Sequence, residues 1–140
     1  MCPAQRKRAA AMTGARPARG PRWRALLETR WQARVREVTE LSLAYHTAAE
    51  AALAAGDVPP GGAAAQEVRA LLRRTAAARR QLADVEEALG RLTAGTFGSC
   101  EQCGSAIPDV LLTAVPETRY CLRCDIEPLR VRALAGRGPR

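Results

Sequence analysis

The stretch CEQCGSAIPDVLLTAVPETRYCLRC, residues 100–124, decides how this 140-residue chain is organised. It contains two Cys-x-x-Cys pairs, Cys100 with Cys103 and Cys121 with Cys124, and seventeen residues separate the pairs. Each pair can place two thiolates on one side of a tight turn, and the intervening length lets the chain fold back to complete a tetrahedron. Zn²⁺ accepts four thiolates at about 2.3 Å and makes no other geometric demand. Because four protein ligands leave no open position for water, the sequence predicts one structural zinc ion, held by these four cysteines.

Two other readings of the cysteines are a pair of disulfides and a redox-active Cys-x-x-Cys motif. Disulfides need an oxidising compartment, and the N-terminus lacks the apolar run of a secretory signal. A thioredoxin-type motif needs a βαβ context, which the sequence does not supply. No stretch of eighteen apolar residues is present, so we expect no membrane association and a cytoplasmic protein.

The formal net charge of +8 comes from the ends of the chain. Residues 1–22 hold six basic residues and no acidic one, and residues 125–140 hold four basic and two acidic residues. Residues 23–124 hold twelve of each sign. Residues 1–22 are therefore expected to form a disordered basic tail. Such a tail either solubilises the protein or makes salt-sensitive, non-specific contacts to nucleic acid.

Two long helices are expected before the cysteines, over residues 23–55 and 63–94. The segment between them, 56–62, reads Gly-Asp-Val-Pro-Pro-Gly-Gly and breaks any helix. In the first helix the apolar stripe consists of Trp31, Val35, Val38, Leu41, Tyr45, Ala48 and Ala52. In the second helix eight successive a and d positions of a heptad repeat are Val68, Leu71, Thr75, Ala78, Leu82, Val85, Leu89 and Leu92. This spacing is typical of a coiled coil, so residues 23–95 are predicted to form an antiparallel hairpin with its tip at 56–62.

The remainder is predicted to be a small zinc module. Residues 96–135 would hold the four-cysteine site and a short helix over about 126–135, with Asp125 as its N-cap, and residues 136–140 would be a tail. Gly95 suits the position that ends the second long helix. The predicted fold class is therefore mainly α: a long antiparallel helical hairpin, a four-cysteine zinc module and a short C-terminal helix.

The region around the cysteines also resembles a known family. The resemblance lies in Ala88-Leu89-Gly90-Arg91-Leu92, in Gly95-Thr96-Phe97-Gly98-x-Cys100-x-x-Cys103-Gly104, in Ile107-Pro108, and in Ala114-x-Pro116-x-x-Arg119-Tyr120-Cys121-x-x-Cys124. Together with the hairpin, this pattern resembles the DksA/TraR C4-type zinc-finger family. Its motif covers about residues 88–127.

The resemblance implies a bacterial transcription regulator that binds RNA polymerase directly. In such proteins the hairpin enters the secondary channel of the polymerase, and acidic residues at the tip act near the catalytic magnesium. Family tips often read Asp-x-x-Asp-x-Ala, whereas residues 57–62 here read Asp-Val-Pro-Pro-Gly-Gly. Asp57 is thus either a single functional carboxylate at the tip or an ordinary turn residue.

Some members of the family respond to the alarmone ppGpp. Where those members carry basic residues, this sequence aligns Asp84, Val115 and Asp125. Carboxylates and an apolar side chain cannot pair with phosphate as arginine or lysine does, so we expect no response to ppGpp through that site.

The sequence does not indicate an enzyme. It has one histidine, a closed metal site and no Gly-rich phosphate loop. Two alternatives to polymerase binding remain at this point: a nucleic-acid-binding zinc ribbon that uses the basic tails, and a helical protein–protein adaptor.

Overall fold

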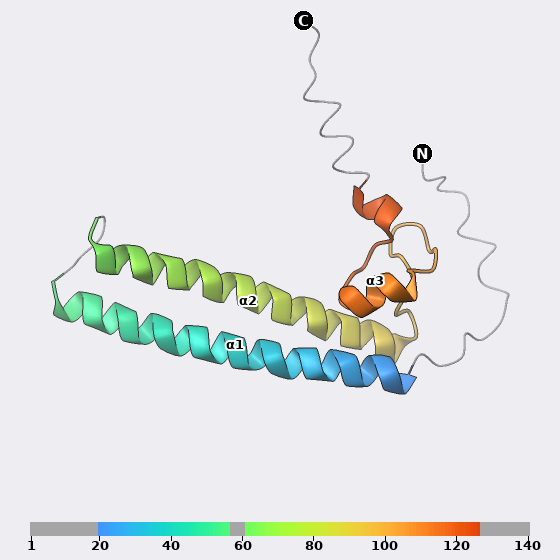
Figure 1. Cartoon of the computed structure of the whole chain (residues 1–140), viewed down its shortest axis with the longest axis horizontal. Coiled ribbons are helices and arrows are strands. Elements are labelled where there is room, and N and C mark those ends of the chain that lie inside the picture. Colours follow the sequence, from blue (N-terminus) through green and yellow to red (C-terminus); the bar gives the residue numbers. More distant parts are fainter. Residues whose placement is uncertain (1–19, 57–60, 127–140) are drawn as a thin grey trace, which may run out of the picture. The chain divides into compact units, whose positions relative to one another are not determined.

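The computed structural model describes residues 20–56 and 61–126. Its helices follow in the order α1 (Gly20–Ala54), α2 (Ala63–Ala94) and α3 (Asp109–Ala114) (Figure 1). The chain divides into two compact units. The hairpin unit is Ala25–Glu87, and the finger unit combines Met1–Arg24 with Ala88–Arg140. The predicted fold class is confirmed, while the predicted domain bounds remain predictions. No described helix has the length and apolar character needed to cross a membrane.

The seam of the hairpin follows the heptad pattern of α2. None of its eight predicted a and d residues is exposed, and Thr75, Ala78 and Val85 are buried. Thr75 is tolerated there because its hydroxyl donates a hydrogen bond to the carbonyl oxygen of Leu71, at 2.8 Å. The arginines of α2 fall off this stripe, as a helix that buries one face requires.

The facing helix, α1, contributes a looser stripe. Leu41 and Ala52 are buried and Val35 is half-buried, but Trp31 is 38% exposed. The indole Nε1 of Trp31 donates a hydrogen bond to Oε1 of Glu86, at 3.2 Å. This contact joins the early part of α1 to the late part of α2, as an antiparallel hairpin demands. Trp31 therefore lies at the edge of the seam, where its ring packs and its polar atom finds a partner.

Both long helices end close to a glycine, as the sequence predicts. Gly56 follows α1 with φ 68° and donates its N–H to the carbonyl oxygen of Leu53. Gly95 follows α2 with φ 76°, and the N–H groups of Thr96 and Phe97 then return to the carbonyl oxygen of Arg91. Residues 57–60 lie outside the described part of the chain, and the predicted tip residue Asp57 lies there too.

The finger unit has a small apolar core of its own. Its buried side chains include Trp23, Phe97, Ile107, Leu112 and Pro116. The rings of Trp23 and Phe97 pack with centroids 5.7 Å apart, so the first turns of α1 contribute to this core. An isolated antiparallel bridge joins Ser99 and Ala106.

Helix α3 was not predicted from the sequence. Its six residues lie between Pro108, which precedes the first turn, and Pro116, and only Leu112 is buried. Thr113 donates its hydroxyl to the carbonyl oxygen of Asp109 at 2.8 Å. A helix this short shows no repeat of apolar positions, and the buried Leu112 is the one feature that marks its inner face.

The predicted start of the C-terminal helix is wrong. Residues 122–126 are already helical, so Asp125 lies inside the helix and is not its N-cap. The N–H of Asp125 donates to the carbonyl oxygen of Cys121 at 3.0 Å, which shows that the helix begins directly from the second cysteine pair. The rest of the predicted range, from residue 127 onwards, lies outside the described residues.

Candidate metal centre

The first cysteine pair sits on a tight loop between residues 98 and 107. The N–H of Cys100 donates to the carbonyl oxygen of Ser105 at 2.8 Å, and the N–H of Gly104 returns to the carbonyl oxygen of Cys100 at 2.9 Å. Gly104 has φ 72°, a left-handed conformation that residues with a Cβ rarely adopt. These bonds close the loop so that the thiols of Cys100 and Cys103 lie on one side of it.

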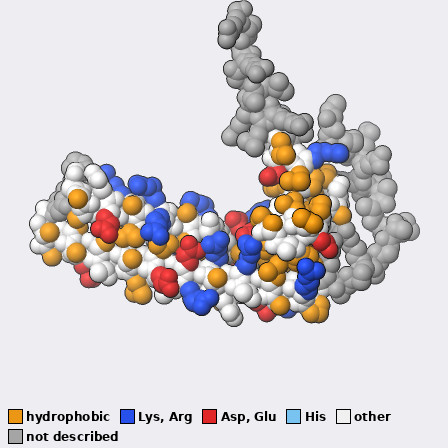
Figure 2. Space-filling model, in the orientation of Figure 1, with side chains coloured by type: hydrophobic (Ala, Val, Ile, Leu, Met, Phe, Trp, Pro, Cys, Tyr) orange, Lys and Arg blue, Asp and Glu red, His pale blue; other side chains and the backbone are white. Residues whose placement is uncertain are grey.

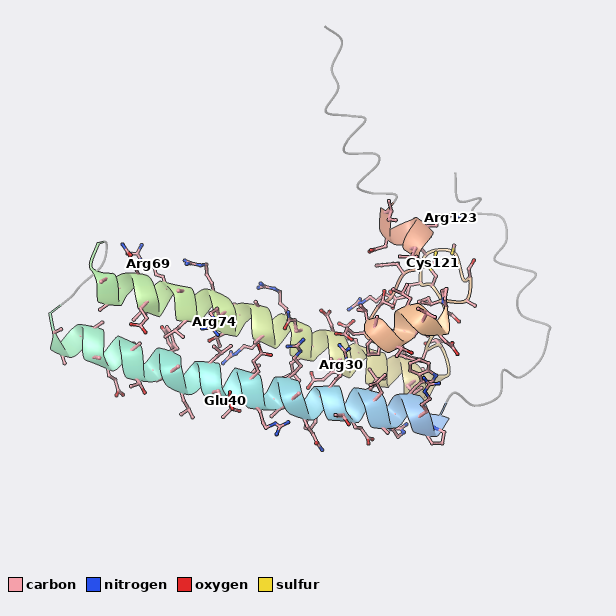
Figure 3. The ribbon with its side chains drawn as sticks, viewed as in Figure 1. Arg30, Glu40, Arg69, Arg74, Cys121 and Arg123 are labelled. Carbon is pink, nitrogen blue, oxygen red and sulfur yellow. The ribbon has the colours of Figure 1, made fainter. Side chains whose placement is uncertain are left out.

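The second cysteine pair is carried by the segment after α3. Cys121 directly precedes the helix at residues 122–126 (Figure 3), and Cys124 lies within its first turn. A backbone hydrogen bond from the N–H of Glu101 to the carbonyl oxygen of Arg119, at 2.9 Å, fixes this segment against the first loop. The two cysteine pairs are therefore brought together by backbone contacts as well as by their spacing.

The four sulfur atoms form a compact cluster. They lie within 4.8 Å of one another, and the Sγ atoms of Cys103 and Cys121 are 3.8 Å apart. Four sulfurs at about 2.3 Å from a tetrahedral zinc ion would be about 3.8 Å from each other. Cys100 and Cys124 are 3% and 1% exposed, and none of these four cysteines forms a disulfide. The cluster thus fits one zinc ion with four thiolate ligands and no position for water.

The hydrogen bonds around Cys103 favour its thiolate form. The side chain of Ser105 and then its backbone N–H hydrogen-bond to this sulfur and lower the pKa of Cys103 to about 6, against an ordinary value of 9.0. Burial acts in the opposite direction but is outweighed. Since zinc binds thiolates, the loop is prepared for a metal ion at neutral pH.

This cluster is the one group of at least three His, Cys, Asp or Glu side chains, over residues 20–56 and 61–126, that could hold a metal ion. His46 is exposed on α1 and packs edge-on against Tyr45, so it is no ligand. Asp84 and Asp125, which stand at two of the positions aligned with ppGpp-binding residues, are exposed. Val115, at the third position, is 43% exposed.

Arg91, which belongs to the family-like motif in the sequence, is a supporting residue of the site. It lies in the last turn of α2, and its side chain contacts both segments that carry the cysteines. In the sequence, three residues separate this arginine from the segment Gly-Thr-Phe-Gly-x-Cys. This spacing could have drawn attention to Arg91, but a sequence does not show what its guanidinium contacts.

These features define a class of protein: a helical hairpin that continues into a closed four-cysteine zinc finger. Residues 95–136 match the family model described as "Prokaryotic dksA/traR C4-type zinc finger". The chain therefore carries a zinc finger of the DksA/TraR family, which confirms the resemblance seen in the sequence.

Two further comparisons agree with this assignment. An uncharacterized protein of Aquifex aeolicus (strain VF5) is 46% identical over 43 residues, which is 31% of this chain and 30% of that protein. The match thus spans less than a third of the relative's length. The structure of transcription factor DksA2 from Pseudomonas aeruginosa aligns with a TM-score of 0.66 and 19% identity, over 79% of this chain and 83% of that one. The second likeness is one of fold.

Proposed function

We propose that this protein is a non-enzymatic transcription regulator that binds RNA polymerase directly. The observation that carries the proposal is the DksA/TraR-type finger at residues 95–136, preceded by a hairpin whose fold is similar to that of the transcription factor DksA2. A closed four-cysteine site supports a structural role for the metal, because it offers no position where a substrate or water could bind zinc.

The hairpin has the physical properties that insertion into a narrow channel requires. Helix α2 has 32 residues, which corresponds to a length of about 48 Å. Its seam is filled by residues that are all buried or half-buried, so the pair of helices is expected to be stiff. The hairpin would then present residues 56–62 at the far end of two mutually supporting helices. In this proposal Asp57 is the residue that acts at the polymerase active site.

The first test is retention of RNA polymerase from a bacterial lysate on the immobilised full-length protein. A Cys103→Ser, Cys121→Ser double variant should lose the finger and with it the polymerase. Cys2→Ser is the matched control, because Cys2 lies in the basic tail away from the other four cysteines in sequence. Absence of polymerase on the wild-type protein, with zinc bound and the helices formed, would contradict the proposal.

The second test separates binding from regulation. Asp57→Asn should leave polymerase retention intact and reduce the effect on transcription in vitro, since it removes one negative charge at the tip. Glu50→Gln, which removes an exposed charge near the end of α1, is the control. Transcription that responds equally to wild type and Asp57→Asn would exclude Asp57 from the mechanism. Addition of ppGpp is expected to change neither result.

A second candidate function is contact with nucleic acid, and one feature of α2 favours it. Residues 68–83 contain five arginines and no acidic residue, although the hairpin unit as a whole is nearly neutral. Figure 2 shows several basic side chains along this helix. Arg69, Arg73 and Arg80 are spaced by four and seven residues and share the face of α2 opposite the seam, and Arg69 points away from α1 in Figure 3. The net charge of the hairpin unit does not reveal this basic stretch, because acidic residues elsewhere in the unit balance it.

Salt dependence of binding to a short DNA duplex tests this second function. Replacing Arg69, Arg73 and Arg80 by Gln should reduce the slope of log affinity against log salt by about 2–3, if each arginine neutralises one phosphate. Replacing Arg6, Lys7 and Arg8 by Gln is the control for the tail. If only the tail variant changes the slope, the arginines of α2 are not a nucleic-acid surface.

A further inference from the structure

The zinc site depends on two segments that are distant in sequence, and a side chain from a third segment contacts both of them. This side chain is Arg91, from the last turn of α2. All the residues concerned belong to the finger unit. Arg91 thus bears on the metal centre, whether or not the protein binds RNA polymerase.

The first contacts of Arg91 are with the segment that leads to the second cysteine pair. Its Nη2 donates a hydrogen bond to the carbonyl oxygen of Glu117 at 3.0 Å and lies 3.5 Å from the carbonyl oxygen of Thr118. These carbonyls precede Cys121 by four and three residues. The guanidinium therefore holds the backbone of this segment directly and does not depend on its side chains.

The other contact is with the loop of the first cysteine pair. Nη1 of Arg91 lies 3.6 Å from Oε1 of Glu101, the residue between Cys100 and Gln102. The carbonyl oxygen of Arg91 also accepts hydrogen bonds from Thr96 and Phe97, which lead into that loop. One residue thus contacts the first loop through its side chain, and the residues that lead into this loop through its backbone.

Burial makes these contacts significant. The side chain of Arg91 is 12% exposed, while that of its ion-pair partner Glu101 is 40% exposed, so solvent screens the pair and the contacts to the carbonyl oxygens are expected to contribute more. A guanidinium withdrawn from water must be paired, and the planar fork of arginine can serve a carboxylate and a carbonyl at the same time. Lysine has one nitrogen and cannot hold both groups in this geometry.

We propose that Arg91 is a positioning residue of the zinc centre, which holds the two cysteine segments at the separation that one tetrahedral ion requires. Residues that orient metal ligands from the next shell typically change metal affinity by about 10–100-fold when they are replaced. The hydrogen bonds and the ion pair of Arg91 are with the two segments that carry the ligands, and none of these contacts is with a sulfur. Replacing Arg91 should therefore change the affinity for zinc and the geometry of its coordination.

The experiment is a zinc competition titration of the full-length protein against a chelating dye. Arg91→Gln should weaken zinc binding by about 10–100-fold. Arg91→Lys should recover part of the loss, because it keeps a positive charge near Glu101 but not the fork. Glu101→Gln, which removes only the ion pair, should cost less than Arg91→Gln. Arg123→Gln is the control for loss of a positive charge, since Arg123 lies on the exposed surface between the last two cysteines, and this variant should lose much less zinc affinity than Arg91→Gln.

Cobalt substitution provides a readout that a general loss of stability would not change. Tetrahedral Co²⁺ with four thiolates has a characteristic visible absorption spectrum, and Arg91→Gln should alter its band positions while circular dichroism shows the helices intact. The inference is overturned if Arg91→Gln binds zinc as tightly as wild type with an unchanged cobalt spectrum. It is also overturned if Arg123→Gln loses as much affinity as Arg91→Gln. If Arg91→Gln does not fold, Arg91→Lys decides the question: zinc affinity equal to that of wild type with an unchanged cobalt spectrum overturns the inference, because lysine cannot hold both groups.

Discussion

The indole ring of Trp23 packs against the phenyl ring of Phe97, with 5.7 Å between the ring centroids and 48° between their planes. Trp23 comes from the first turns of α1, and Phe97 lies just beyond the end of α2. They are 4% and 6% exposed. The start of α1 is thereby part of the core that supports the zinc loop, residues 98–107, which carries the first cysteine pair.

Phe97→Ala is expected to destabilise the finger unit by about 3–5 kcal/mol, because it removes a buried aromatic ring and leaves a cavity beside Trp23. Urea unfolding followed by tryptophan fluorescence measures the change. Val110→Ala is the control, since Val110 is 83% exposed and should change stability by less than about 0.5 kcal/mol. Equal effects of the two substitutions would show that Phe97 is not part of a packed core.

The seam of the hairpin leads to a second prediction. Val85 is 0% exposed on α2, so Val85→Asp buries an unpaired charge and should cost at least about 3 kcal/mol. Leu72→Asp, on the same helix at a position that is 52% exposed, should change stability by less than about 1 kcal/mol. Thermal unfolding followed by the helical circular dichroism signal distinguishes them. A large effect at Leu72 would mean that its side is covered by a partner, such as a second copy of the chain.

Metal removal should affect the two units differently. The finger core consists of few side chains, so zinc binding is expected to contribute much of its folding free energy. The hairpin buries its own apolar seam. After treatment with a chelator we therefore expect most of the helical signal to persist, while amide exchange over residues 96–124 accelerates strongly. Protection that is unchanged across the finger without zinc would contradict this.

Acidification should release the metal, because protons compete with zinc for the thiolate of Cys103. Its pKa in the folded chain is about 6 and its ordinary value is 9.0. Because the folded pKa is the lower one, the stabilising contribution of this thiolate is fully present above about pH 9 and is lost as the pH falls through about 6. Zinc should be retained at neutral pH and released on acidification, at a pH below the pKa of the metal-free thiol, because the bound ion competes with protons for the thiolates.

The Ser105 hydroxyl is the largest cause of this lowered pKa, so Ser105→Ala should move zinc release to a higher pH. A chelating dye followed across a pH series gives the midpoint. Ser99→Ala, on the other side of the same loop, should leave it unchanged. A midpoint that does not respond to Ser105→Ala would mean that the hydroxyl does not stabilise the thiolate.

Repeated spacing explains what the sequence could reveal about this protein. The eight a and d positions of α2 define a face without reference to any other part of the chain, and α2 spans Ala63–Ala94 as expected. The Cys-x-x-Cys pairs are just as local, because each loop is closed by hydrogen bonds within a few residues of its cysteines. Gly95 could be assigned to the end of α2 since a positive φ favours glycine.

The features that could not be predicted from the sequence depend on contacts between residues that are distant in the chain. Helix α3 is too short for a periodic pattern, and its inner face is set by the burial of Leu112. The last helix begins one turn before Asp125 because the backbone of Cys121 already accepts a helical hydrogen bond. The position of the Arg91 guanidinium follows from the folding of residues 117–119 against the zinc loop, which no local pattern encodes. Asp57 lies outside the described residues, so its role stays a prediction.

The heptad repeat of the hairpin also has an evolutionary consequence. Removing seven residues from each helix, at facing positions, would shorten the coiled coil by about 10 Å and leave the remaining a and d residues in register. The zinc loop, the Trp23–Phe97 core and the contacts of Arg91 involve residues before position 25 and after position 87, so such a deletion would not touch them. Hairpin length can therefore diverge in whole heptads among descendants of one ancestral gene while the metal-binding end stays the same.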